Sequence, residues 1–251
     1  MTIKAITFDL WDTIVDDDSD EPLRKERGLR SKRDERRHQV WEALNAIEPI
    51  DYEKVALAYD TAEAGFNVVW KECHINWTVD QRLRVVLNGL GRQVPEDVYQ
   101  DLVIGHSRME VDIPPRLNPG IAEALEELAK KYSLCIVSDA IVTPGTGLRE
   151  ILENYDLKRY FSAFAFSDEV GHSKPHRSMF DKVANELGFA VDELVHIGDR
   201  DHNDVKGPHA LGAKAVLYTG SRDGDKDITT ADAICEHHRD LPAVIERLAN
   251  Q

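Results

Sequence analysis

The chain of 251 residues has only three cysteines, and it lacks the run of roughly 18 apolar residues that a transmembrane helix needs. At the N-terminus an acid, Asp9, interrupts the sequence before a secretory signal core could form. Cys73, Cys135 and Cys235 are odd in number and widely spaced, so they predict neither a disulfide framework nor a metal-binding pair. We therefore expect a cytoplasmic protein with free thiols and no membrane partner.

Basic residues are also few compared with acidic ones. The chain has 31 basic and 46 acidic residues, which gives a net charge of −15. A chain this acidic repels a phosphate backbone, so we expect no nucleic-acid partner. A small anionic substrate can still bind in a local positive pocket. The length predicts one large domain or one domain with an insert, acting as a monomer or homodimer.

Two kinds of pattern divide the chain. Residues 16–111 have helical periodicity and predict four helices, near 22–46, 51–73, 78–90 and 95–109. Outside this stretch, short apolar runs alternate with helical segments. The runs predict strands at 3–10, 133–138, 163–167, 194–197, 213–218 and 231–235. The alternation predicts an α/β fold with a parallel sheet covered on both faces and a helical insert.

Acidic or hydroxyl side chains follow four of these strands. They are Asp9, the pair Ser138 and Asp139, Asp168, and Asp199. An acid after a strand is usually a turn residue or a helix cap. Because the carboxyl ends of parallel strands meet at one edge of a sheet, where ligands collect, we expect these side chains to share a site.

Four segments resemble, in order, the motifs of the haloacid dehalogenase (HAD) superfamily. They are Phe8-Asp9-Leu10-Trp11-Asp12-Thr13, Val137-Ser138-Asp139, Ser173-Lys174-Pro175 and His196-Ile-Gly-Asp199-Arg-Asp-His-Asn203-Asp204. The resemblance implies a Rossmannoid, HAD-like catalytic core at residues 1–15 and 112–251. It also implies that residues 16–111 form a helical cap domain between the first and second motifs.

The resemblance also implies roles for single residues. Asp9 would be the nucleophile, forming a covalent aspartyl intermediate that splits the displacement into two steps. Ser138, Asp139 and Lys174 would bind the substrate, with Lys174 and Ser138 stabilising its charge, and Thr13 would orient the loop or the transferred group. A Mg²⁺ ion, which prefers hard oxygen ligands, would be held by Asp9, the backbone carbonyl of Trp11, Asp199 and Asp204.

Trp11 departs from the phosphatase pattern, which has an acid at this position. Loss of a general acid costs about 10²- to 10⁴-fold in rate. Relatives that displace halide from carbon have an aromatic residue there and use no metal, but they usually replace the metal-binding Asp that is kept here as Asp199. Three hypotheses remain. We favour a Mg²⁺-dependent phosphatase of a small phosphorylated metabolite or acyl phosphate over a 2-haloacid dehalogenase-type C–X hydrolase, and both over a non-catalytic phospho-ligand-binding protein.

Other residues allow two interpretations each. Asp12 could substitute for the missing acid, but a role as a capping or outward-facing polar residue is favoured. Residues 24–37 hold eight basic groups against three acids, and a solvated helix face is the favoured interpretation. In the alternative, Arg30, Arg33 and Arg37 would clamp a carboxylate or second phosphate of the substrate. His172 and His202 are the histidines expected nearest the site.

Overall fold

The computed structural model describes residues 2–251, and contacts divide them into two compact units. Unit 1 comprises the chain up to Asp17, Pro115–Asp139 and Leu152–Gln251. Unit 2 comprises Asp18–Pro114 and Ala140–Ile151. The second segment of unit 2 was not expected from the sequence. It is held there by hydrogen bonds from Asn76 Nδ2 to the Ala140 carbonyl (3.3 Å) and from Arg82 to the Ile141 carbonyl.

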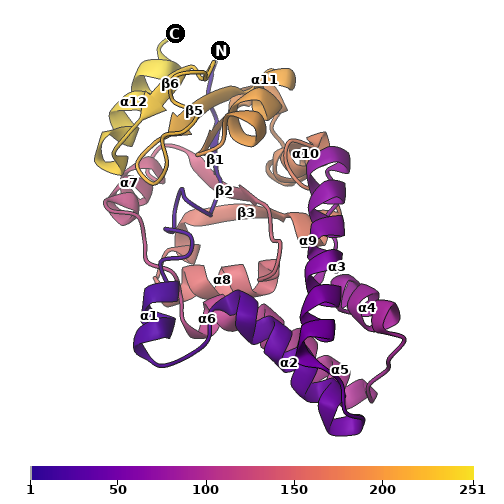
Figure 1. Cartoon of the computed structure of the whole chain (residues 1–251). Helices are drawn as coiled ribbons and strands as arrows, with labels where there is room; N and C mark the ends of the chain where they lie inside the picture. The colour runs from indigo at the N-terminus through magenta and orange to yellow at the C-terminus, as the bar shows by residue number, and fades with distance from the viewer. Residues whose placement is uncertain (1) are drawn as a thin grey trace. The chain divides into compact units, whose positions relative to one another are not determined.

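Unit 1 contains a six-stranded sheet in which every neighbouring pair is parallel (Figure 1). The strand order is β3-β2-β1-β4-β5-β6. The strands are β1 (Ala5–Phe8), β2 (Ser133–Ser138), β3 (Phe161–Phe166), β4 (Leu194–Gly198), β5 (Lys214–Tyr218) and β6 (Ala233–Cys235). The α/β class and the parallel sheet predicted from the alternating pattern are confirmed.

Helices cover this sheet, because strands buried on both faces need apolar partners on each side. They are α7 (Ile121–Leu128), α9 (Ser167–Val170), α10 (Arg177–Leu187), α11 (Gly207–Ala210) and α12 (Leu241–Ala249). Short 3₁₀ turns lie at Lys158–Tyr160, Val191–Glu193 and His238–Asp240, and a π-helical segment at Asp201–Lys206. This π-helical segment and α11 follow one another directly between β4 and β5.

Helix α10 shows how the sequence sets an element and its packing. Its N-cap residue His176 accepts a hydrogen bond from the backbone of Ser178, and Gly188 ends it with a φ of 71°. Positive φ favours glycine at this position of a helix end. Met179, Phe180 and Val183, which share one helical face, are fully buried in the same cluster as the core residues of β1, β2 and β3.

Unit 2 is helical. It contains α1 (Glu21–Glu26), α2 (Lys32–Ile47), α3 (Tyr52–Cys73), α4 (Val79–Leu90), α5 (Glu96–Ser107) and α6 (Met109–Asp112), and most of α8 (Gly145–Asn154) (Figure 1). Val40, Leu44, Val55, Leu83 and Leu102 are among the buried residues of its core. Among the described residues, no helix has the length and apolarity that crossing a bilayer requires.

The single helix predicted near 22–46 is wrong, because the structure has two helices there. Gly28 takes a φ of 70° just after α1, and Ser31 begins α2 as an N-cap that accepts a hydrogen bond from the Asp34 backbone. Both are helix-boundary signals. The dense run of charged helix formers around them had concealed the break.

Candidate active site

Strand register brings the ends of three strands together. Phe8 at the end of β1 pairs with Ile136 of β2 and Ile197 of β4. The backbone N–H of Asp9 then donates to the carbonyl of Ile197 at 2.8 Å. The residues that follow these strands therefore lie around Asp9.

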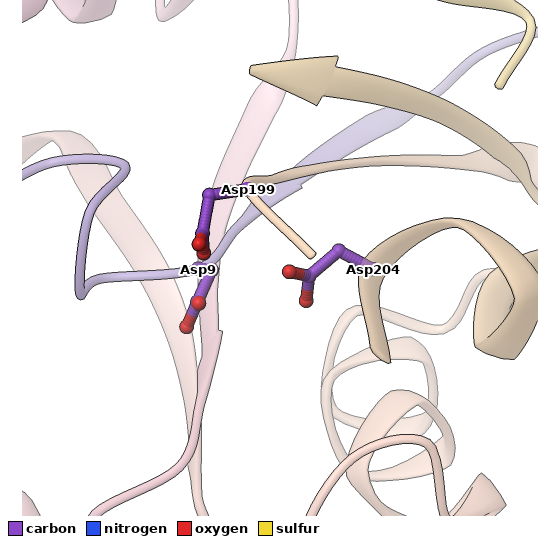
Figure 2. A group of neighbouring side chains, drawn as sticks. All are labelled: Asp9, Asp199 and Asp204. Carbon is purple, nitrogen blue, oxygen red and sulfur yellow. The ribbon is translucent and has the colours of Figure 1, made fainter. Parts of the chain in front are cut away.

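Three buried carboxylates form one group in unit 1 (Figure 2). Asp9 follows β1, Asp199 follows β4, and Asp204 comes from the π-helical segment after β4. One oxygen from each lies within 4.8 Å of the others. Figure 2 shows the three side chains as neighbours, with the carboxylate of Asp204 directed toward Asp9 and Asp199. Burying several like charges is costly unless cations or hydrogen bonds compensate, so the group requires a counter-charge.

Lys174 supplies part of that counter-charge. Its Nζ lies 2.8 Å from Asp9 Oδ1 and 2.7 Å from Asp204 Oδ1, and the residue is 3% exposed. Its backbone N–H donates to Asp139 Oδ1 at 2.9 Å. Burial lowers the pKa of Lys174, but the attraction of Asp204, Asp9 and Asp139 outweighs burial and holds that pKa above its usual range. Lys174 is therefore an ammonium ion.

Asp9 is held by short local contacts. Its Oδ1 accepts a hydrogen bond from the Leu10 backbone at 2.8 Å, and the same N–H lies 3.4 Å from Ser138 Oγ. Thr13 follows in the same loop, fully buried, and its Oγ1 has no hydrogen-bond partner. Its carbonyl accepts from Asn118 Nδ2 at 3.0 Å and from His238 Nε2 at 2.8 Å. The loop that carries Asp9 is thus fixed at both ends.

Asp204 is the most completely bonded carboxylate of the three. Lys174 Nζ and His196 Nε2, the latter at 3.1 Å, contact Oδ1, and the Arg200 backbone donates to Oδ2 at 3.0 Å. Burial raises its pKa, but Lys174 and His196 outweigh burial and hold the pKa below its usual range. Gly198 makes room for it, since a Cβ at that position would lie 2.3 Å from Asp204 Cγ.

Asp199 is the least compensated. Its Oδ2 lies 3.3 Å from Arg222 Nη1 and 3.6 Å from Arg200 Nε, while its buried Oδ1 has no hydrogen-bond partner. Burial, followed by repulsion from Asp204 and Asp9, raises the pKa of Asp199 to about 8. Burial likewise raises the pKa of Asp139 to about 6, against the opposing effect of Lys174. A cation beside Asp199 would relieve this repulsion.

Trp11 and Asp12 are both engaged in local contacts. The Trp11 Nε1–H donates to the Asp139 carbonyl at 3.1 Å. Asp12 takes a φ of 53°, and its Oδ1 accepts from the Asp17 backbone at 3.2 Å. Burial raises the pKa of Asp12. A carboxylate that closes a turn in this way fits the structural role favoured for Asp12 from the sequence.

The arginines proposed to clamp the substrate pair with acids inside unit 2. Arg33 and Arg37 both contact Asp60, Arg37 through Nε at 2.9 Å, and Arg30 pairs with Glu35 at 3.2 Å. The favoured solvated helix face describes only part of this basic run. Lys32 is 5% exposed, and its Nζ contacts Asp18, Asp20 and Glu110.

Three side chains beside the carboxylates had no expected role. His196 lies in β4, Arg200 directly follows Asp199, and Arg222 comes from the loop after β5. His196 and Arg200 lie within the fourth motif segment, so position alone could have flagged them. No signal marked Arg222. Asp168, in the first turn of α9, lies outside the carboxylate group, and the ring of His172 stacks on His176 at 3.9 Å.

Comparison with known proteins decides the family. A family model described as haloacid dehalogenase-like hydrolase matches residues 3–212. The chain belongs to this family. The matched region includes all four motif segments and the three carboxylates, so membership agrees with the order of the motifs.

Individual relatives of the haloacid dehalogenase-like chain include different enzymes. Phosphoglycolate phosphatase of Escherichia coli (strain K12) is 31% identical over 128 residues, which are 50% of this chain and 49% of that protein. The match thus spans about half the length of the curated relative. The structure of a HAD phosphatase from Thermococcus onnurineus has a TM-score of 0.63 at 22% identity, covering 97% of this chain and 98% of its own.

A 2-haloacid dehalogenase from Pseudomonas syringae pv. Tomato DC3000 is just as similar in structure. Its TM-score is 0.64 at 20% identity, covering 98% of this chain and 100% of its own. Likeness at this identity establishes the fold and does not distinguish phosphatase from dehalogenase chemistry. That choice depends on the residues of the site.

Proposed function

We propose that this haloacid dehalogenase-like hydrolase is a Mg²⁺-dependent phosphatase of a small phosphorylated metabolite or acyl phosphate. The observation that carries the proposal is the group of Asp9, Asp199 and Asp204, with Lys174 bonded to two of its members. Such a group suits phosphoryl transfer, which depends mainly on positioning and on neutralising charge.

The donor set fits Mg²⁺. Carboxylate oxygens are hard ligands, and Mg²⁺ is usually held by few of them together with water. Asp199 Oδ1 is buried without a partner, and a buried acceptor of this kind needs an explanation. In this proposal Asp9, Asp199 and Asp204 hold the ion, with the Trp11 backbone carbonyl as a further ligand. When bound, the ion would act as a Lewis acid toward the phosphoryl oxygens.

The residues of the chain then divide the reaction between them. Asp9 Oδ1 is engaged by Leu10 and Lys174, which leaves Oδ2 to attack phosphorus. The bond from phosphorus to the leaving oxygen breaks, and an aspartyl phosphate forms. Water then attacks the phosphorus of this intermediate, and the bond between phosphorus and Asp9 Oδ2 breaks. Inorganic phosphate leaves with the proton of the water, and the Asp9 carboxylate is restored. Lys174 neutralises charge, the Ser138 hydroxyl and backbone N–H groups of the site bind phosphoryl oxygens, and Thr13 orients the loop.

Trp11 narrows the substrate class. The Trp11 side chain has no carboxyl group that could donate a proton to a leaving group, and its Nε1–H is already bonded to the Asp139 carbonyl. A leaving group that departs as a stable anion, such as the carboxylate of an acyl phosphate, needs no such proton. We therefore expect acyl phosphates to be hydrolysed faster than alkyl phosphates. Phosphoglycolate is a further test substrate because of the curated relatives.

Several wider features belong to the same proposal. Unit 2 would be the cap domain, and residues Ala140–Ile151, which join it, would belong to the cap as well. Arg200 and Arg222, rather than Arg30, Arg33 and Arg37, would present positive charge to an anionic substrate, since both contact Asp199 and are 42% and 38% exposed. A cytoplasmic location fits the free thiols of Cys73, Cys135 and Cys235.

The dehalogenase alternative has one observation in its favour, the aromatic Trp11 at the acid position. Asp199 and Asp204 argue against this alternative. Displacement of halide without a metal would leave these two carboxylates with Lys174, Arg200 and Arg222 as their only cations among the described residues. Halide release from 2-chloropropionate in EDTA therefore distinguishes this alternative from the phosphatase.

The deciding experiment compares acetyl phosphate, p-nitrophenyl phosphate and phosphoglycolate hydrolysis with Mg²⁺ and with EDTA. Asp9→Asn is the variant, because the amide keeps the size of the side chain and removes the nucleophile. We expect Mg²⁺-dependent phosphate release that falls about a thousandfold or more in the variant. Phosphate release from none of the three substrates, together with halide release in EDTA, would replace the phosphatase by the dehalogenase.

A further inference from the structure

A buried series of hydrogen-bonded side chains connects β1 to the carboxylate group. Thr7 of β1 and His196 of β4 are paired in the strand register and are both fully buried. His196 Nδ1 lies 2.8 Å from Thr7 Oγ1, and His196 Nε2 lies 3.1 Å from Asp204 Oδ1. The imidazole thus joins the hydroxyl to the carboxylate, and no role in the family motifs accounts for it.

The surroundings of His196 leave its ring little freedom. The ring of Phe180 from α10 meets it edge-on, with centroids 5.2 Å apart and planes at 90°. Residues of α10 cover this face of the sheet, and backbone pairing fixes the position of β4. The ring can therefore contact Asp204 only through Nε2.

Geometry also assigns the proton of the imidazole. Asp204 Oδ1 contacts the Lys174 ammonium at 2.7 Å and is therefore a carboxylate oxygen. A ring nitrogen that faces a carboxylate oxygen carries a proton, so Nε2 is the donor. In a neutral ring Nδ1 then accepts a hydrogen bond. The Thr7 hydroxyl provides it at 2.8 Å, whereas its other acceptor, the Val195 carbonyl, lies farther away at 3.4 Å.

This assignment determines how many acceptor positions of the Asp204 carboxylate remain free. A carboxylate accepts about four hydrogen bonds, two on each oxygen. Lys174 and His196 use both acceptor positions of Oδ1, and the Arg200 backbone uses one of Oδ2. One acceptor position is left, on Oδ2, for a cation or a water molecule bound to it.

We propose that Thr7 and His196 are positioning residues for the divalent cation, with the Thr7 hydroxyl selecting the Nε2–H form of His196 that holds Asp204 in place. The inference rests on the proposed function, because it assumes that Asp204 helps to bind Mg²⁺. Partners of this kind, which orient a metal ligand, usually change metal affinity about 10- to 100-fold when they are removed.

The test separates the hydroxyl of Thr7 from its bulk. Thr7→Val keeps the shape of the side chain and removes the donor, whereas Thr7→Ser keeps the donor and removes a methyl group. We expect Thr7→Val to weaken Mg²⁺ binding in calorimetric titrations by about 10- to 100-fold, and Thr7→Ser to stay near the wild-type affinity. Urea denaturation in EDTA establishes that both variants are folded.

Nitrogen-15 NMR of the metal-free wild-type protein provides a second measurement, which reports which ring nitrogen of His196 carries the proton. A variant is needed only to assign the signals. His196→Gln identifies the signals of His196 by their loss. We expect a protonated Nε2 and an unprotonated Nδ1 that accepts a hydrogen bond.

The outcomes are distinguishable. If the wild-type protein binds no Mg²⁺, the proposed function fails and takes the metal-positioning role with it. If it binds Mg²⁺ but Thr7→Val and Thr7→Ser have the same affinity, whether unchanged or reduced, the inference alone is overturned. A wild-type His196 protonated at Nδ1 would overturn it as well.

Discussion

The indole of Trp11 donates its Nε1–H to the backbone carbonyl of Asp139, across a distance of 3.1 Å. This bond joins the loop after β1 to the residue after β2, and it occupies the only polar atom of the Trp11 side chain. Trp11 stands where the phosphatase motif has an acid. Its side chain therefore supplies no general acid and instead holds the two loops together.

The first prediction concerns this position. In the proposed mechanism Trp11→Asp adds the missing general acid, so kcat for phosphoglycolate should rise about 100-fold or more. Hydrolysis of acetyl phosphate should change little, because its leaving group needs no proton. The ratio of the two rates is the measurement. Trp11→Phe is the control, since it removes the bond to Asp139 without adding an acid, and an equal rise in that variant would contradict the explanation.

A second prediction follows from the burial of Lys174. Lys174→Met keeps the length of the side chain but leaves Asp9 and Asp204 without their shared cation. Removing one partner of a buried ion pair costs about 3–5 kcal/mol, so the free energy of unfolding in urea, measured in EDTA, should fall by that amount. Lys182→Met is the matched control.

That control removes a partner of a different kind of pair. Lys182 contacts Glu186 at 2.6 Å, but the two side chains are 48% and 45% exposed. Exposed pairs contribute about 0–1 kcal/mol, so this variant should be nearly as stable as the wild type. If Lys174→Met lowers the free energy of unfolding by no more than Lys182→Met does, Lys174 is not the cation that stabilises the buried carboxylates.

The third prediction concerns Gly198, whose added Cβ would lie 2.3 Å from Asp204 Cγ. Gly198→Ala must displace Asp204 or the end of β4. We expect a loss of about 1–3 kcal/mol in stability, the usual cost of overpacking, together with loss of Mg²⁺ binding in calorimetry. Wild-type Mg²⁺ affinity in this variant would refute the placement of Asp204 in the metal site.

A matched glycine lies in α4 of unit 2. Gly89 has nothing within 4 Å of an added Cβ, so Gly89→Ala should raise stability by about 0.5–1 kcal/mol through its helix propensity. Mg²⁺ binding should be unchanged there, since unit 2 contributes none of the three carboxylates.

The fourth prediction is a pH dependence in unit 2. His106 is 1% exposed, and burial, followed by repulsion from Arg36, lowers its pKa from 6.5 to about 3. The unfolded chain therefore takes up a proton near pH 6.5 that the folded protein does not. Stability from this group is present above pH 6.5 and is lost as pH falls below it, by about 2 kcal/mol between pH 7 and pH 5.

Urea denaturation at these two pH values measures the effect. His106→Leu should lose about 2 kcal/mol less than the wild type on going from pH 7 to pH 5. The exposed His237 provides the control, because His237→Leu should show the full wild-type difference. An unchanged pH dependence in His106→Leu would show that another group causes the acid sensitivity.

Much of the fold followed from local patterns. Short apolar runs identified the strands of the sheet, and helical periodicity identified α3, α4 and α5 of unit 2. The break at Gly28 was missed because charged helix formers continue on both sides of it. Residues 140–151 could not be assigned to unit 2, because what holds them there are side chains distant in sequence, such as Asn76 and Arg82.

The site divides in the same way. The motif segments identified Asp9, Asp199 and Asp204 because each follows a strand or lies one short turn beyond it. The assignment of substrate-binding cations to Arg30, Arg33 and Arg37 remains a prediction, and the acids that pair with them, Asp60 among them, are not adjacent in sequence. Arg222 stands in a loop without a motif, so only its contact with Asp199 reveals it.

The sequence by itself determined the family, the strands and the order in which the carboxylates reach the edge of the sheet. These depend on residue type and on spacing along the chain. The tertiary structure decided how those charges are compensated. Lys174 between Asp9 and Asp204, His196 between Thr7 and Asp204, and the unpartnered Oδ1 of Asp199 are relations across strands. They exist only once the register is set, because hydrogen bonds and Coulomb interactions depend on distances in space.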